Sequence, residues 1–256
     1  MSDQIQKKQN VFGAVIYLKD GNLLQGAALV SDFNRRWGVP FLVGEGQKED
    51  CVYFRSGDFH FAIEFRSVPV PQRVRDSILN HTPDRRFCEE LLAKHKAHFG
   101  LSASLDSGRL LDLACVFTKL IVSVLRVAPA LAVCWLHGPV LCSAQEFLDV
   151  AEGMLSIGSP PLMLWINVEW KPEKLVIHSK GMSQFQAPEI LLSGQYESSR
   201  EIVEYLFEAA HYVLTAGKDI LDGETIDGPK GVFRISYVKG REPGKRALIL
   251  IPVRPN

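Results

Sequence analysis

The sequence lacks the cysteine patterns that usually carry chemistry. Its 256 residues contain five cysteines, and no two of them form a C-x-x-C pair. The odd number and wide spacing disfavour a disulfide framework or a zinc ribbon. We therefore expect reduced, buried thiols in a cytosolic protein. The alternative is a catalytic thiol at Cys134 paired with His137, but no neighbouring residue would activate that thiol.

The sequence also lacks an excess of charge of either sign. It has 29 lysines and arginines against 29 aspartates and glutamates. A general nucleic-acid binder presents a basic face, so this balance disfavours that class and we expect no nucleic-acid partner.

No segment has the character of a membrane span or a secretory signal. The first ten residues are polar, without an apolar core. The longest uncharged run, residues 127–145, is interrupted by Pro129, Gly138 and Pro139. The apolar stretch before it carries Asp112, Lys119 and Arg126. We expect no membrane association and a cytoplasmic location.

Four catalytic signatures are missing: G-x-x-x-x-G-K-[ST], G-x-G-x-x-G, G-x-S-x-G and H-E-x-x-H. Their absence disfavours P-loop, Rossmann, α/β-hydrolase and zincin chemistry. We accordingly expect a protein that is not an enzyme, with no catalytic residue, no cofactor and no metal.

Hydrophobic periodicity predicts the secondary structure. We expect strands at 11–18, 51–55, 59–68, 97–104, 130–137, 162–170, 174–179, 189–192, 231–239 and 247–253. Helices are expected at 23–37, 72–79, 85–95, 108–128, 143–155 and 198–216, with Ser143 and either Ser198 or Ser199 as N-caps. Hairpins mix with strand–helix–strand units, which predicts an α+β fold with mixed, largely antiparallel sheets, helices packed on them and a weak internal duplication.

No low-complexity linker divides the chain. We therefore expect residues 1–256 to form a single globular α+β domain. If it has two lobes, they would join near residues 69–92 or at residues 158–161.

Two groups of residues suggest a metal site. His95 and His98 are three apart, so one helical turn would bring both to the same face. Asp222, Glu224 and Asp227 offer oxygen ligands, but their spacing does not match an EF-hand loop. Structural histidines and a turn at Asp222-Gly223 are the interpretations we favour. The alternative is a metal-dependent enzyme of unknown substrate.

Acidic residues follow helical spacing on two predicted helices. Those in the last helix are Glu197, Glu201, Glu204 and Glu208, in steps of four, three and four, with no lysine between them and only Arg200 close by. A shorter row in the 143–155 helix consists of Glu146, Asp149 and Glu152. Such rows are usually solvated faces. They also suit a docking surface for a basic partner.

The C-terminal half carries a resemblance. The segment from His178 to Ile190, a helix ending Tyr212-Val213-Leu214, and Asp222-Gly223-Glu224-Thr225-Ile226 together resemble the bacterial family known as domain of unknown function 4261. Its members have a Gly-Met or Gly-Leu step, a Phe-Gly followed by an acidic residue, a long helix and then Asp-Gly-x-Thr. A looser likeness runs from about Val11 to Leu250. One departure is Gln186, where the family commonly has glycine.

The resemblance implies an α+β bacterial cytosolic protein without established catalytic residues, so it transfers no site. Gly181 suits a tight backbone step and Phe185 suits packing beneath the helix. Relatives of this kind resemble proteins found beside secreted toxins, and some small α+β proteins of that setting are immunity factors.

From these observations we expect a non-enzymatic immunity protein that neutralises a cognate secreted toxin, for example a type VI secretion nuclease, by direct occlusion. Its acidic rows would face the toxin's basic surface. Besides the metal-dependent enzyme, an accessory or assembly protein of a secretion cluster remains an alternative.

Overall fold

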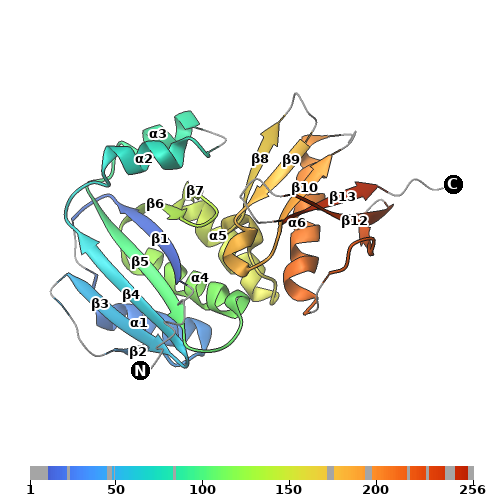
Figure 1. Cartoon of the computed structure of the whole chain (residues 1–256). Coiled ribbons are helices and arrows are strands. Elements are labelled where there is room, and N and C mark those ends of the chain that lie inside the picture. Colours follow the sequence, from blue (N-terminus) through green and yellow to red (C-terminus); the bar gives the residue numbers. More distant parts are fainter. Residues whose placement is uncertain are drawn as a thin grey trace, which may run out of the picture. The chain divides into compact units, whose positions relative to one another are not determined.

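The computed structural model describes residues 11–21, 24–44, 48, 50–82, 85–171, 176–193, 198–217, 220–228, 231–239 and 246–252. The chain divides into two compact units (Figure 1). Unit 1 comprises residues 1–136 and 141–159, and unit 2 comprises residues 137–140 and 160–256. Residues 69–92 lie within unit 1, whereas the 158–161 stretch contains the last crossing between units. The expectation of a single domain stays a prediction, since compact units need not fold independently.

Unit 1 is built on a seven-stranded sheet with the order β2-β3-β4-β5-β1-β6-β7. The central strand β1 pairs antiparallel with β5 and β6, and β3 to β5 form an antiparallel meander. The strands are β1 (Val11–Leu18), β2 (Leu42–Val43), β3 (Cys51–Ser56), β4 (Phe59–Arg66), β5 (Ala97–Leu105), β6 (Ala130–Trp135) and β7 (Val140–Ser143).

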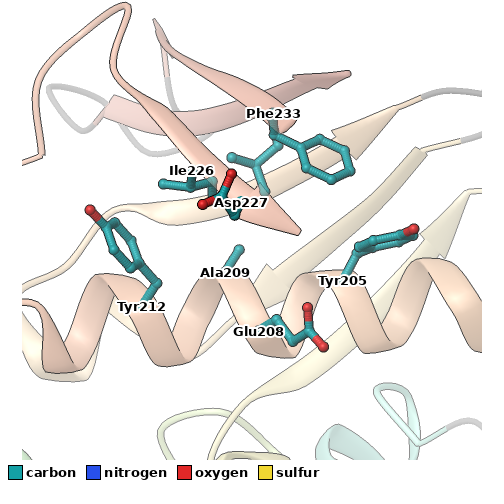
Figure 2. Close-up of a pocket in the computed structure, with 8 residues that line it drawn as sticks. Tyr205, Glu208, Ala209, Tyr212, Ile226, Asp227 and Phe233 are labelled. Atoms are coloured by element: carbon teal, nitrogen blue, oxygen red, sulfur yellow. The ribbon is translucent and has the colours of Figure 1, made fainter. Parts of the chain in front are cut away.

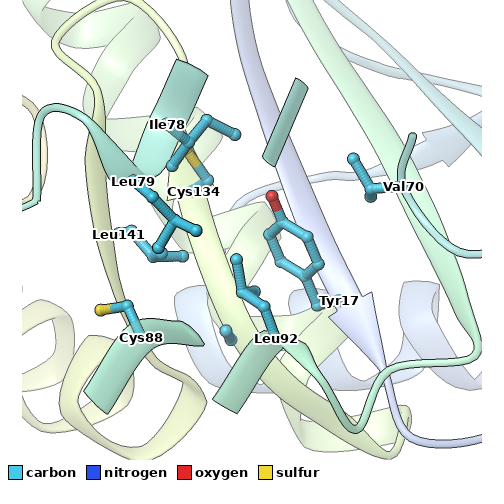
Figure 3. Close-up of a cluster of buried hydrophobic side chains, with 9 residues drawn as sticks. Tyr17, Val70, Ile78, Leu79, Cys88, Leu92, Cys134 and Leu141 are labelled. Atoms are coloured by element: carbon cyan, nitrogen blue, oxygen red, sulfur yellow. The ribbon is translucent and has the colours of Figure 1, made fainter. Parts of the chain in front are cut away.

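Helices cover both faces of this sheet because β1 and β6 are apolar on both sides. On one face Phe117 of α4 packs against Trp135, with ring centroids 5.3 Å apart, and α4 also contacts α1 and α5. On the other face α2 and α3 cover Tyr17 and Cys134 (Figure 3). The helices are α1 (Gly26–Trp37), α2 (Gln72–Leu79), α3 (Arg85–Leu92), α4 (Leu110–Val127) and α5 (Ala144–Ser156).

Unit 2 contains a six-stranded mixed sheet with the order β11-β12-β13-β10-β9-β8. β10 and β13 are parallel, while the other pairs are antiparallel. The strands are β8 (Asn167–Lys171), β9 (Val176–Lys180), β10 (Glu189–Ser193), β11 (Thr225–Gly228), β12 (Gly231–Lys239) and β13 (Arg246–Pro252). Helix α6 (Ser199–Thr215) packs on β9, β10 and β11, and short 3-10 helices lie at Leu162–Leu164 (η1) and Met182–Phe185 (η3).

The predicted α+β class with mixed, largely antiparallel sheets is confirmed. Most elements fall within a few residues of their expected bounds, and Ser143 and Ser198 cap α5 and α6 through the Glu146 and Glu201 amides. The strand expected from Leu162 is wrong at its start, where residues 162–164 form η1 and the strand begins at Asn167. Strands β2, β7 and β11 were not predicted, because each has four residues or fewer.

Among the described residues, no helix combines the length and apolar character that crossing a membrane requires. The internal duplication stays a prediction.

Candidate functional site

Helix α6 carries three of the four acidic residues predicted on it, and Glu197 lies outside the described residues. The helix begins after Ser198, whose hydroxyl accepts a hydrogen bond from the Glu201 amide at 3.2 Å. Ile202, Leu206 and both alanines at 209 and 210 are buried. Glu204 and Glu208 are therefore directed to the exposed side.

The three carboxylates of α6 differ in their surroundings. Arg200 donates to Glu204 at 2.8 Å, an exposed pair one turn apart. The Tyr205 hydroxyl donates to Glu201 at 3.4 Å. Within the described part of the chain, Glu208 has neither a hydrogen bond nor an ion pair. The acidity of α6 is thus only partly compensated by its own arginine.

A small pocket opens beside Glu208, between α6 and strands β11 and β12 (Figure 2). The space among its lining atoms, which runs out into open solvent and is not an enclosed cavity, amounts to about 260 Å³. Its floor is apolar and aromatic, and a second carboxylate, that of Asp227, stands at its rim. The lining residues are Tyr205, Glu208, Ala209, Tyr212, Ile226, Asp227, Phe233 and Leu250.

Burial and the neighbouring Glu204 carboxylate raise the pKa of Glu208 above its ordinary value. Both causes act against the charged form. A cation placed near Glu208 would favour the charged form of its carboxylate, so this part of α6 is suited electrostatically to a positively charged group.

The acidic row on α5 is engaged differently. Arg126 donates to both oxygens of Glu152, at 2.6 and 2.8 Å, and Arg36 donates to it at 3.4 Å. Asp149 accepts from the Gln145 amide at 2.7 Å. Glu146 is exposed in the first turn of the helix. Glu152 therefore ties α5 to α1 and α4.

Arg36 extends this network to Asp32, which is only 6% exposed. Both Arg35 and Arg36 donate to Asp32 at 3.1 Å. Burial opposes ionisation, but hydrogen bonds from Arg36, Ser123 and Arg35 outweigh it, so the pKa of Asp32 lies below its ordinary value. The buried carboxylate is thus held in its charged form.

His95 and His98 are hydrogen-bonded to the backbone that follows β4. The Val70 amide donates to Nε2 of His95 at 2.8 Å, so the ring proton is on Nδ1, which donates to the Leu92 carbonyl. Nδ1 of His98 lies 2.9 Å from the Val68 carbonyl. Burial lowers the pKa of His95 against the effect of its Leu92 bond. Both histidines therefore take the structural role we favoured.

The acidic loop of unit 2 is a turn, as expected. Residues 222 and 223 form it, with Gly223 at φ 83°. Asp222 accepts from the Tyr237 amide at 2.9 Å, and Glu224 accepts from the Leu221 amide at 3.0 Å. Over the described residues, no group of three or more histidine, cysteine, aspartate or glutamate side chains is arranged to hold a metal ion.

None of the five cysteines forms a disulfide, and Cys88, Cys134 and Cys142 are buried. Burial raises the pKa of Cys134 to about 12, with a smaller contribution from Cys88. Its thiol stays protonated at neutral pH, which is the opposite of what a nucleophile needs.

The segment that carries the family resemblance is organised around Glu189 at the start of β10. Its carboxylate accepts from the Ser179 hydroxyl at 2.6 Å. It also accepts from the amides of Gly181, Met182 and Ser183 at 3.0 to 3.2 Å. A carboxylate at the first turn of η3 satisfies amides that have no partner within the helix. The acidic residue of this motif therefore has a structural role.

Two glycines allow the backbone to pack closely beside this turn. A Cβ at Gly181, where φ is 128°, would lie 2.8 Å from the Trp165 carbonyl oxygen and 2.9 Å from the Gly138 Cα. The Gln184 amide donates to the same Trp165 carbonyl at 3.0 Å. The tight backbone step predicted at Gly181 is confirmed. Phe185 packs against the Trp165 ring, with centroids 5.7 Å apart.

Gln186, where the resemblance implies glycine, has the left-handed conformation with φ 60° and ψ 20°. It is the one residue other than glycine with positive φ in the described part of the chain. The backbone therefore keeps the shape that glycine favours, although the side chain differs.

Sequence reasoning found Glu208 but missed the pocket beside it. Tyr205, Glu208, Ala209 and Tyr212 follow the i, i+3, i+4, i+7 spacing of one helix face, which was a detectable signal. The other half of the pocket comes from Ile226, Asp227 and Phe233. Their approach to α6 depends on the pairing of β11 with β12, which no local pattern predicts.

No curated protein and no solved structure matches the chain. A family model does match, over residues 178–246. The match covers about a quarter of the chain and contains the Glu189 turn, α6 and the pocket-lining strands β11 and β12. It confirms the resemblance for this segment, whereas the looser likeness upstream of it has no match. Residues 178–246 are thus similar to the family described as Domain of unknown function (DUF4261).

Proposed function

We propose that the chain is a non-enzymatic binding protein that recognises a basic partner protein through the exposed acidic face of α6. In its finer form, the proposal is an immunity protein that neutralises a cognate secreted toxin, such as a type VI secretion nuclease, by occluding its basic surface. A nuclease uses that surface for phosphate groups, so an acidic protein can compete for it.

The observation that carries the proposal is the incomplete pairing of the α6 carboxylates. Glu204 has one exposed arginine, whose contribution in solvent is small, and Glu208 has no cationic partner in the described part of the chain. Like charges one turn apart cost a few tenths of a kcal/mol. A partner that supplies positive charge would reverse this cost.

The structural roles of the competing groups add support. His95 and His98 bind backbone groups, and the Cys134 thiol is protonated. The residues on which a metal-dependent or thiol enzyme would depend therefore have roles in the fold. The α5 row is a weaker candidate surface, because arginines of the same unit already engage Glu152.

The test is co-purification of the chain with the product of the adjacent gene, at low and high salt. Glu204→Lys with Glu208→Lys should weaken binding at least tenfold, mainly through slower association and loss of the salt dependence. Glu201 is left native in this variant, because its carboxylate accepts from Tyr205 and lies at the positive end of the helix dipole.

The matched control is Glu89→Lys with Glu90→Lys on α3. These two residues are exposed and paired with arginines one turn away, so the variant changes the net charge equally. It should bind as the native chain does. Asp149→Lys tests the α5 row separately. Unchanged binding by the α6 variant, or equal weakening by the α3 control, would contradict the proposal. Capture of a secretion-apparatus component instead of a toxin would indicate the accessory role.

A further inference from the structure

Helices α2 and α3 form a hairpin that lies over one face of the unit 1 sheet. Each helix buries two of its side chains: Ile78 and Leu79 on α2, and Cys88 and Leu92 on α3. Figure 3 shows these four side chains gathered around the Tyr17 ring. The hairpin therefore closes an apolar surface of the sheet with a small number of side chains.

His95 joins the two ends of this hairpin. The amide of Val70, which lies just before α2, donates to Nε2 of the ring at 2.8 Å. Nδ1 of the same ring donates to the carbonyl of Leu92, the last residue of α3. The ring is buried and meets the Tyr17 ring edge to face, with centroids 5.1 Å apart. One neutral imidazole thus holds both the entry and the exit of the hairpin.

Two polar groups beneath the hairpin oppose its closure. The Tyr17 hydroxyl and Nε of Arg75 are inaccessible to solvent, and neither has a hydrogen-bond partner within the described residues. Arg75 lies one turn before Ile78 and Leu79, and hence on the inward side of α2. A buried polar group without a partner lowers the stability of the closed arrangement, because the group has lost its water. Both groups therefore favour local opening of the hairpin.

Protonation of His95 would remove its bond to Val70. An imidazolium carries a hydrogen on both nitrogens, so Nε2 could no longer accept from the amide. The titratable and charged side chains around the ring are Tyr17 of β1, Arg75 of α2 and His98 of β5. Burial lowers the pKa of His95, the Leu92 bond opposes this, and the positive charges of Arg75 and His98 lower it further.

His98 contacts the same segment with the opposite polarity. Its Nδ1 lies 2.9 Å from the Val68 carbonyl, which can only accept, so Nδ1 is the donor. A protonated His98 keeps this hydrogen bond, whereas a protonated His95 loses the bond from Val70. The two histidines therefore form a matched pair in which only His95 is sensitive to protonation through its hydrogen bond.

We propose that the α2–α3 hairpin is a pH-sensitive flap, held closed by neutral His95 and released when that ring is protonated. Opening exposes the apolar face around Tyr17 and Cys134. The inference concerns a device in unit 1 and goes beyond the proposed function, which concerns α6 of unit 2, so each can fail without the other.

The experiment is hydrogen–deuterium exchange of the full chain between about pH 5 and pH 7.5, with rates corrected for the pH dependence of intrinsic exchange. In the open flap His95 regains its ordinary pKa of 6.5, so closure weakens as pH falls below that value. Exchange in α2 and α3 should accelerate by up to about tenfold per pH unit, until pH reaches the folded pKa. Helix α4 of the same unit should keep its protection.

Matched glutamine variants identify the group responsible. His95→Gln keeps an acceptor and a donor but does not titrate, so exchange in α2 and α3 should become independent of pH over this range. His98→Gln should keep the pH dependence of the native chain. Tyr17→Phe removes the unpartnered hydroxyl and should slow exchange of both helices about threefold to tenfold at pH 7.5.

A second readout uses the native chain alone. Cys134 is buried beneath the hairpin, so its labelling by a pyridyl disulfide, relative to the unfolded chain at the same pH, should accelerate between pH 7.5 and pH 5.5. This measurement decides the question if His95→Gln does not fold. Native exchange and labelling that do not change with pH, a pH dependence retained by His95→Gln, or equal acceleration in α4 would overturn the flap.

Discussion

Glu152 on α5 and Glu208 on α6 both lie on a helix surface with another acid one turn away, but their surroundings differ. Glu152 is held by Arg126 and Arg36, which come from two other helices. Glu208 has no cationic partner among the described residues, and burial together with the neighbouring Glu204 carboxylate raises its pKa. The comparison shows that acidic spacing alone does not define a docking surface. What distinguishes the two helices is whether the fold itself supplies the opposite charge.

The largest change in stability is expected at Asp32, which is buried and is linked to Glu152 of α5 through Arg36. Asp32→Asn should lower the free energy of unfolding by about 2 kcal/mol at pH 7, because two arginines lose a charged acceptor. Since the pKa of Asp32 is lowered on folding, its contribution is present above its ordinary value of 3.8 and is lost as pH falls through the folded pKa.

Urea denaturation between pH 3 and 7 measures this difference. Asp149→Asn is the control, since that carboxylate is exposed and, among the described residues, accepts only from Gln145. Equal unfolding free energies for the two variants would show that the arginine network does not stabilise unit 1 through Asp32.

Smaller changes in stability are expected when Glu152 of α5 and Glu204 of α6 are each replaced by glutamine. Glu152→Gln should cost about 1 kcal/mol, because its bidentate pair with Arg126 is partly buried. Glu204→Gln should change stability by less than about 0.5 kcal/mol, because its single arginine is exposed. Chemical denaturation of both variants at two salt concentrations checks this order, and the reverse order would break the distinction between α5 and α6.

The smallest effect should have the opposite sign. Glu208→Gln should stabilise the chain by a few tenths of a kcal/mol at pH 7, because it removes repulsion from Glu204. A raised folded pKa means that the native residue contributes most below its ordinary value of 4.5 and loses that contribution as pH rises through the folded pKa. The gain from Glu208→Gln should therefore vanish near pH 4. A variant less stable than the native chain at pH 7 would indicate an unseen cationic partner for Glu208.

Features that depend on residues close together in the sequence could be predicted, whereas features that depend on residues far apart in the sequence could not. The apolar repeat of α4 and the serines at 143 and 198 mark helices through contacts within a few residues, and these predictions hold. The arginines that bind Glu152 lie 26 and 116 residues away in sequence. Asp227 reaches the α6 pocket only because β11 pairs with β12. No local pattern contains either arrangement.

In the segment from His178 to Ile190, too, the local backbone feature was predicted and the contacts between distant residues were not. Its glycine suggested a tight backbone step, and Gly181 provides one. That the Glu189 carboxylate accepts four hydrogen bonds could not be read from spacing, because it depends on how β10 returns beside β9. Gln186 has the left-handed conformation that glycine favours, which its residue type does not predict.

The sheet of unit 2 includes residues that lie outside the family match, so the matched segment alone cannot form it. The family segment starts inside β9 and stops at Arg246, the first residue of β13, yet β13 is the neighbour of both β10 and β12. Residues 137–140 also belong to this unit: Gly138 packs beside Gly181, and the Pro139 carbonyl accepts from Asn167 at 2.9 Å. A gene fragment that encodes only 178–246 would therefore leave strand edges open and lose this inserted tetrapeptide. The segment needed to form the complete sheet of unit 2 is therefore longer than the family match at residues 178–246.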